Sequence, residues 1–316
     1  MMREIGGYLR LDTYKLPMLH DGAIALNSGR NCLAYLIQKR NIKKIYLPKF
    51  LCASVGDTCK KYGVDVEYYS VETSLMPVID DTPDGWLYVV NYYGQLCNEL
   101  FAELKKKHED IIIDNIQAYF QDPVESIDTI YTCRKFFGVT DGAFLYSDVG
   151  LDDSLEEDYS WSRVEHIMGS FELGASAFYS RYASAEEEFE NMPIRKMSKL
   201  TDNLLRAIDY EEVKKTRTAN FSYLHKMFGK INKLRITIPD GPYMYPLFIE
   251  NGAEVRKKLQ QIKVFIPTLW PDVFNICKDD EVEYDMVNNI LPIPVDQRYS
   301  IKDMEYIVKQ VEACLR

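Results

Sequence analysis

Short apolar strand patterns alternate with helical patterns from residue 28 to about residue 147, and this alternation constrains the fold more than any other feature. Ser28 can cap a helix in which Cys32, Leu33 and Leu36 recur at helical spacing. Further strands are predicted at 44–48, 64–71, 86–93, 110–114, 128–132 and 142–147, and further helices at 53–61 and 99–108. Such alternation predicts an α/β fold with a mostly parallel central sheet covered on both faces.

The pattern changes after Ser147. An acidic and strongly helical region follows, and its charged runs at 152–158 and 186–190 are predicted to be solvated helix faces. Proline-rich and aromatic segments then resume, before a last amphipathic helix at 301–314. We predict a large domain at 1–200 and a small C-terminal α+β domain at 201–316.

Composition removes several classes of function. The formal net charge of -10 argues against nucleic acid or an anionic membrane as a partner, and no window approaches the roughly 18 apolar residues of a membrane span. The opening residues lack the apolar core of a secretion signal, so a cytoplasmic location is expected. Seven cysteines without a CxxC pair, and four scattered histidines, give no metal-binding spacing.

Three segments of the α/β half suit one cofactor. The turn 27–31 opens a helix, whose free N–H groups can bind phosphate. Asp114 ends an apolar strand, on the sheet edge where α/β proteins bind ligands, and Lys135 follows the next strand. A buried Asp and a Lys around a phosphate are what pyridoxal 5'-phosphate (PLP) chemistry requires: the lysine forms a Schiff base, and the carboxylate keeps the pyridine nitrogen protonated.

The sequence resembles the DegT/DnrJ/EryC1/StrS family of sugar aminotransferases over nearly its whole length. The most specific matches are the Asp-x-x-Gln motif at 114–117 and a lysine followed by a Gly-x-x-Asp-Gly turn at 138–142. Weaker matches lie at 26–33, 45–55, 91–95, 193–198 and 291–295. The resemblance implies the three-layer PLP-transferase type I fold and a homodimer with active sites at the subunit interface.

By matching position, the resemblance implies a role for each site residue. Lys135 would be the Schiff-base lysine and acid/base, Asp114 the partner of the pyridine nitrogen, and Gln117 a neighbour of the ring hydroxyl. The phosphate would be bound by Ser28, Gly29, Arg30 and Thr132.

The chain departs from the family pattern in two places. Where many members place an aromatic residue over the cofactor ring this chain has Cys52, so stacking is left to Phe50, Tyr92 or Tyr93. The region between residues 142 and 193 is short, and the segment 193–198 matches only part of the family's substrate motif. Arg195 and Tyr93 are candidate substrate residues, with Arg195 approaching the partner subunit's site. We interpret Trp270 as a packing anchor between domains.

The expected activity is transfer of an amino group from an amino acid, by resemblance glutamate, to a keto sugar, by resemblance nucleotide-linked. Two alternatives stay open at this point. One is another PLP-dependent reaction, such as that of a lyase, a racemase or a non-sugar transaminase. The other is a PLP-binding regulatory protein without catalysis.

Overall fold

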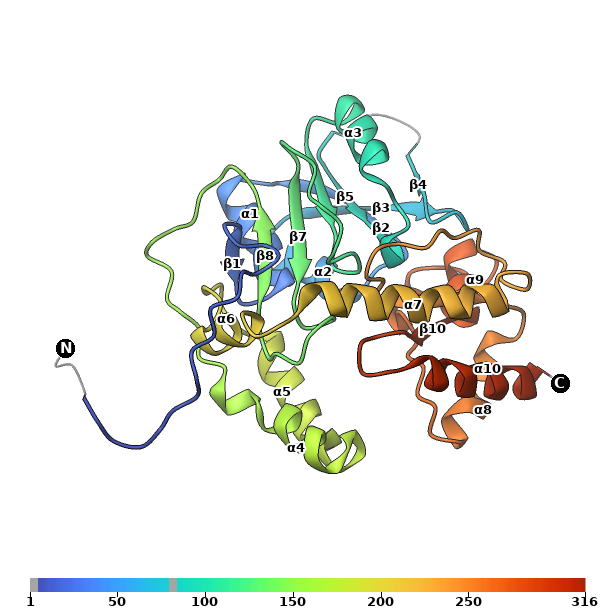
Figure 1. Cartoon of the computed structure of the whole chain (residues 1–316). Helices are drawn as coiled ribbons and strands as arrows, with labels where there is room; N and C mark the ends of the chain where they lie inside the picture. Colours follow the sequence, from blue (N-terminus) through green and yellow to red (C-terminus); the bar gives the residue numbers. More distant parts are fainter. Residues whose placement is uncertain (1–4, 80–83, 316) are drawn as a thin grey trace.

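A computed structural model describes residues 5–79 and 84–315 of the chain. Its centre is an eight-stranded sheet in the order β1-β8-β7-β6-β5-β2-β3-β4 (Figure 1). The strands are β1 (Ile24–Leu26), β2 (Lys44–Pro48), β3 (Asp65–Val71), β4 (Pro77–Val78), β5 (Trp86–Val90), β6 (Ile111–Asp114), β7 (Asp128–Thr132) and β8 (Ala143–Tyr146). Strands β2, β3, β5, β6 and β7 are parallel, and antiparallel strands close both edges. The predicted mostly parallel sheet is therefore confirmed.

The strand predicted at 86–93 is too long by three residues. It ends at Val90, and Asn91 accepts a hydrogen bond from the Leu96 N–H (2.9 Å) that closes a tight turn. Within this turn Tyr93 has a φ of 54°, a left-handed conformation that an extended strand does not contain. The polar Asn-Tyr-Tyr-Gly turn therefore outweighs the β propensity of its two tyrosines.

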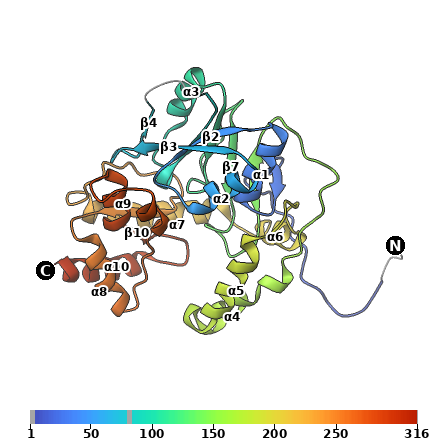
Figure 2. The same ribbon diagram turned by 180° about the vertical axis from the view of Figure 1, so that it is seen from behind.

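The helices of the sheet-forming half start and end close to the predicted positions. They are α1 (Gly29–Lys39), α2 (Ala53–Lys61) and α3 (Asn98–Lys107). The Ser28 hydroxyl accepts a hydrogen bond from the Asn31 N–H (3.1 Å), which confirms the predicted N-cap. Helix α1 packs on β7 and β8, and α2 packs against α1 and β3. Both helices lie on one side of the sheet (Figure 2). Helix α7 (Tyr210–Phe228) begins beside Tyr119 and Phe137 and packs on a strand and a helix of the C-terminal part.

The acidic region contains two helices, α4 (Glu165–Leu173) and α5 (Tyr179–Glu190), which project away from the sheet (Figures 1 and 2). The prediction of a solvated helix face at 152–158 is wrong: this run is not helical, and Asp158 is buried. Asp158 accepts a hydrogen bond from the buried Arg163 (2.7 Å). Burial of a carboxylate is costly without such a partner, and the charge run gave no sign of this pairing.

The C-terminal part combines helices with a small antiparallel sheet. Its elements after α7 are β9 (Met244–Phe248), α8 (Gly252–Gln261), α9 (Val282–Asn289), β10 (Ile290–Pro294) and α10 (Ile301–Leu315), and the short α6 (Lys199–Leu205) precedes α7. Strands β9 and β10 pair with each other and not with the large sheet. Helices α7, α8 and α10 bury a core of their own against this pair. Residues such as Phe248 and Met286 pack instead into the core beneath the large sheet.

A division into two domains at residue 200 stays a prediction.

No helix among the described residues is long and apolar enough to cross a membrane.

Candidate active site

A cavity of about 280 Å³ lies where β6 and β7 end and α1 begins. All seven predicted cofactor residues line it: Ser28, Gly29, Arg30, Asp114, Gln117, Thr132 and Lys135. They come from three separate segments of the chain, and the sheet topology brings them together because the parallel strands β6 and β7 are neighbours. Ligands of open α/β sheets bind at this carboxyl end of the strands.

Asp114 and Lys135 form the electrostatic centre of the cavity. The Asp114 carboxylate is buried and accepts hydrogen bonds from the Tyr88 hydroxyl and the Ile116 N–H, both at 2.8 Å. Burial raises the pKa of Asp114, and the nearby Lys135 opposes that rise. Burial lowers the pKa of Lys135, against the attraction of Asp114. The site thus favours a less basic lysine amine beside a carboxyl group held by two donors.

Two side chains from the C-terminal part fix the backbone next to this lysine. The carbonyl of Phe136 accepts hydrogen bonds from the buried Arg217 (3.1 Å) and from Gln297 (2.7 Å). Because Phe136 directly follows Lys135, these contacts hold the start of the lysine side chain in place.

The N-terminus of α1 forms one wall of the cavity. A Cβ atom on Gly29 would lie 2.9 Å from Cδ1 of Ile116, so only glycine fits there without displacing Ile116. The helix runs for 11 residues, and its first N–H groups carry the positive end of the helix dipole. Thr132 lies nearby at the end of β7, where its hydroxyl contacts the Gly142 carbonyl at 3.5 Å. This wall can bind a phosphate group through backbone N–H groups.

The side-chain amide of Gln117 has a hydrogen-bonded oxygen and a nitrogen without a partner among the described residues. Its Oε1 accepts a hydrogen bond from the Tyr93 N–H (2.8 Å), whereas Nε2 is buried and has no partner among the described residues. A buried amide donor without a partner is costly in a folded protein. Because Gln117 also lines the cavity, this donor is available to an acceptor atom of a ligand.

Helix α5 contributes three residues that the sequence did not place in the site. Glu186, Phe189 and Glu190 line the cavity, although the run 186–190 is predicted to be a solvated face. Glu186 forms an ion pair with Arg134. The Arg134 guanidinium lies 3.9 Å from the centre of the Phe189 ring, and the Phe189 carbonyl accepts a hydrogen bond from Arg30 (3.3 Å). The helical charge pattern hid these contacts, because Phe189 is the run's one apolar residue.

Trp270 also lines the cavity. Its ring packs against Phe50 and Tyr92, with centroid distances of 5.4 and 6.4 Å, so the predicted packing role describes only part of its surroundings. Phe50, Tyr92 and Tyr93 are buried and are not among the cavity's lining residues. As a substrate residue Tyr93 would therefore act through Gln117, which accepts a hydrogen bond from its backbone.

Arg195 lies outside the cavity. Its guanidinium contacts Glu156 (3.4 Å) and Asp158 (3.6 Å), and its backbone N–H is 3.4 Å from Oδ1 of Asn27. The segment 193–198 is thereby tied to the start of α1. Its other end is fixed by Asp141 of the Gly-x-x-Asp-Gly turn, which accepts hydrogen bonds from the N–H and the hydroxyl of Ser198, both at 2.8 Å.

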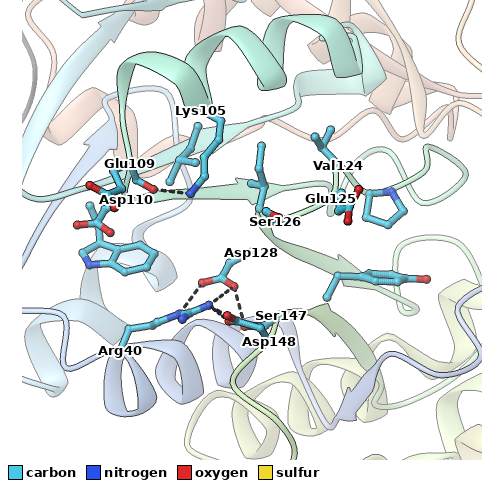
Figure 3. Close-up of a pocket in the computed structure, with 15 residues that line it drawn as sticks. Arg40, Lys105, Glu109, Asp110, Val124, Glu125, Ser126, Asp128, Ser147 and Asp148 are labelled. Atoms are coloured by element: carbon cyan, nitrogen blue, oxygen red, sulfur yellow. Dashed lines mark hydrogen bonds and ion pairs between the residues drawn. The ribbon is translucent and has the colours of Figure 1, made fainter.

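A larger cavity, of about 720 Å³, lies at the opposite end of the strands (Figure 3). Asp128, the first residue of β7, accepts two hydrogen bonds there from Arg40 (2.9 and 3.1 Å), as Figure 3 shows. None of the predicted site residues lines this cavity. Its charged groups stabilise the amino-terminal edge of the sheet.

One group of potential metal ligands occurs in the described part of the chain. Cys277, Glu281 and Glu283 bring their ligand atoms within 4.8 Å of one another. Both carboxylates already have partners: Glu281 pairs with Lys49 (2.9 Å), and Glu283 accepts a hydrogen bond from the Val71 N–H (2.8 Å). These contacts join the start of α9 to the residue that follows β2 and to the end of β3.

Comparison with solved structures identifies the fold. The structure of S. venezuelae DesV in complex with a ketimine intermediate superposes with a TM-score of 0.67 at 15% identity, covering 93% of this chain and 85% of that one. A DegT DnrJ EryC1 StrS aminotransferase from Brucella abortus gives 0.63 at 11% identity, with coverages of 92% and 85%. The sugar aminotransferase CalS13 from Micromonospora echinospora gives 0.62 at 13%, with 92% and 87%.

No protein-family model matches the chain, and no curated protein matches its sequence. At these identities the structural likeness establishes the fold: the chain has the α/β fold of the DegT/DnrJ/EryC1/StrS aminotransferases. The predicted fold class is confirmed, and the sequence resemblance is confirmed at the level of the fold.

Proposed function

We propose that this protein is a PLP-dependent aminotransferase acting on a keto sugar. The observation that carries the proposal is that Lys135 and Asp114 line one cavity, whose wall is the N-terminus of α1, and influence each other's pKa there. The fold comparison supports it, because DesV and CalS13 share the architecture. The unpartnered Nε2 of Gln117 supports PLP in particular, since it offers a donor to a ring hydroxyl.

The residues of the cavity fit the parts of PLP. Ser28, Gly29 and Thr132 would hold its phosphate, and Asp114 would keep its ring nitrogen protonated. When bound, PLP supplies an electron sink for the substrate carbon. Lys135 would take a proton from that carbon and return it to the cofactor's exocyclic carbon, a task for which the pKa-lowering effect of burial suits its amine.

The sequence resemblance also suggests the identity of the two substrates. Glutamate would serve as the amino donor, and the acceptor would be a nucleotide-linked keto sugar. We also propose a homodimer, in which Arg195 of one subunit approaches the other subunit's cavity. Replacement of Arg195 by alanine would then weaken binding of the acceptor more than binding of the amino donor.

The decisive experiment uses Lys135→Ala together with Asp114→Asn. The wild-type protein should bind PLP covalently, giving a visible absorption band and an adduct that borohydride reduction fixes on Lys135. Lys135→Ala should lose that adduct, whereas Asp114→Asn should retain it and lose transamination with glutamate and keto-sugar acceptors.

A reducible adduct that persists in Lys135→Ala would place the anchor on another lysine and contradict the proposal. Covalent PLP binding without amino transfer from any donor would indicate the lyase, racemase or regulatory alternatives instead.

A further inference from the structure

Two aromatic rings from the C-terminal half of the chain lie near Lys135, and one of them, Trp270, lines the cavity. Nζ of Lys135 lies 5.4 Å from the centre of the Tyr243 ring and 5.9 Å from that of Trp270. On the N-terminal side, the position that the family gives to a stacking aromatic is Cys52. Its thiol contacts the Ser54 hydroxyl (3.2 Å) and lines the same cavity. A cysteine presents no flat face to a ring, so an aromatic contact in this cavity has to come from another residue.

Trp270 is held in a defined position. Phe50 meets it in an edge-to-face arrangement with the two ring planes at 67°, and Tyr92 lies behind Phe50 at 5.2 Å. The Tyr92 hydroxyl is fixed in turn by the Phe50 carbonyl (2.5 Å). The chain that follows Trp270 is also fixed: Glu281 pairs with Lys49, and Glu283 accepts a hydrogen bond from the Val71 N–H. An indole fixed in this way loses little conformational entropy when a ligand contacts it.

We propose that Trp270 supplies the aromatic contact to the PLP ring, because Cys52 occupies the position at which many family members place a stacking aromatic residue. The inference rests on the proposed function, since it assumes that PLP occupies this cavity. Trp270 is a positioning residue in this role: it orients the ring, while Lys135 and Asp114 act on the reacting atoms. An aromatic pair contributes about 0.5–1.5 kcal/mol beyond buried area, so its loss corresponds to about 2–10-fold in affinity.

The test measures PLP affinity in three proteins that carry the same catalytic groups. PLP is removed from wild type, Trp270→Phe and Trp270→Leu, and each apoprotein is titrated with PLP while the visible absorption is recorded. We expect Trp270→Leu to bind PLP about tenfold more weakly, and Trp270→Phe to stay within about threefold of wild type, because phenylalanine keeps a flat ring. Circular dichroism and thermal unfolding establish that each variant folds.

Unchanged affinity in Trp270→Leu, with only the acceptor KM raised, would overturn the inference and make Trp270 a substrate contact. Equal weakening in both variants would assign the effect to the indole N–H and also overturn it. Failure of the wild-type protein to bind PLP would overturn the proposed function itself, so the two failures are distinguishable.

Tryptophan fluorescence gives a second readout that does not depend on activity. The chain has three tryptophans, of which Trp86 lines the cavity at the far end of the sheet and Trp161 is 73% exposed. PLP should quench the emission of a variant that retains only Trp270 more strongly than that of variants retaining only Trp86 or only Trp161. Equal quenching in the three variants would contradict contact between Trp270 and the ring.

Discussion

His20 is a buried residue whose protonation should couple directly to folding. It lies among Tyr119, Tyr131, Phe144 and Tyr146; Nε2 contacts the Tyr119 carbonyl (2.9 Å), and Nδ1 contacts the Tyr146 hydroxyl (3.1 Å). Burial lowers the pKa of His20 to about 4, more strongly than the Tyr119 hydrogen bond and the nearby Asp122 raise it. The native state therefore keeps the imidazole neutral between pH 4 and 6.5, where the unfolded chain takes up a proton.

This difference predicts a stability that rises with pH over that window. As the pH falls from 8 to 5, protonation of His20 in the unfolded chain should lower the free energy of unfolding by about 2 kcal/mol. In His20→Asn, which can form one of the two hydrogen bonds, the dependence on pH should be flatter even though the variant is less stable at pH 8. Urea unfolding at several pH values measures both slopes, and equal slopes in the two proteins would exclude His20 as the group that titrates.

At the scale of single elements, α5 makes an unusual contribution to a phosphate site. Glu186 pairs with Arg134, and Glu190 lies near Arg30, so carboxylates already neutralise the two arginines beside the N-terminus of α1. A phosphate bound at this N-terminus would compete with these carboxylates for the attraction of the two arginines. Replacing Glu186 with glutamine removes one negative charge from the wall of the cavity.

Glu186→Gln should therefore bind PLP more tightly, by about 2–5-fold if the change is worth about 0.5–1 kcal/mol. Pyridoxal without the phosphate should bind equally to variant and wild type, because it carries no group that competes for Arg134. Glu187→Gln is the matched control, as Glu187 is the exposed neighbour on the same helix. If PLP bound Glu186→Gln no more tightly than Glu187→Gln, the ion pair would have no influence on the phosphate.

The elements of this molecule differ in how far their sequence determines them. Strand β6 and the Ser28 cap could be predicted, because an apolar run and a capping hydroxyl act through neighbouring residues alone. Asp114 and Lys135 could be grouped because neighbouring strands bring their ends together, whereas the assignment of the other five predicted cofactor residues rests on the family resemblance. The positions of α5 and Trp270 could not, since they depend on contacts between segments more than 50 residues apart, such as Arg134 with Glu186.

At the scale of the whole molecule, α4 and α5 carry apolar side chains that face solvent. Met168, Phe171 and Leu173 are 65%, 93% and 72% exposed, and Tyr179 is 70% exposed. Clustered exposed apolar groups on a projecting hairpin are typical of an association surface. We predict that this hairpin belongs to the interface of the proposed homodimer.

Phe171→Glu should shift the protein from dimer to monomer, because it places a charge in an apolar interface. Sedimentation velocity over a range of protein concentrations measures the shift, and Glu172→Gln, at the neighbouring exposed position, is the control. A Phe171→Glu protein that remained dimeric at the same concentrations as the control would remove α4 from the interface.

The cavity is assembled from residues in both halves of the chain, so it cannot be complete while the second half is still being synthesised. Ser28 and Trp270 share one cavity, and the carbonyl next to Lys135 is held by Gln297. A nascent chain on the ribosome can pair the large sheet long before residue 297 leaves the exit tunnel. Until then, the lysine loop lacks this hydrogen bond and the cavity lacks its Trp270 wall. Capture of PLP in a finished cavity would therefore wait until residue 297 has left the exit tunnel, well after the large sheet can form.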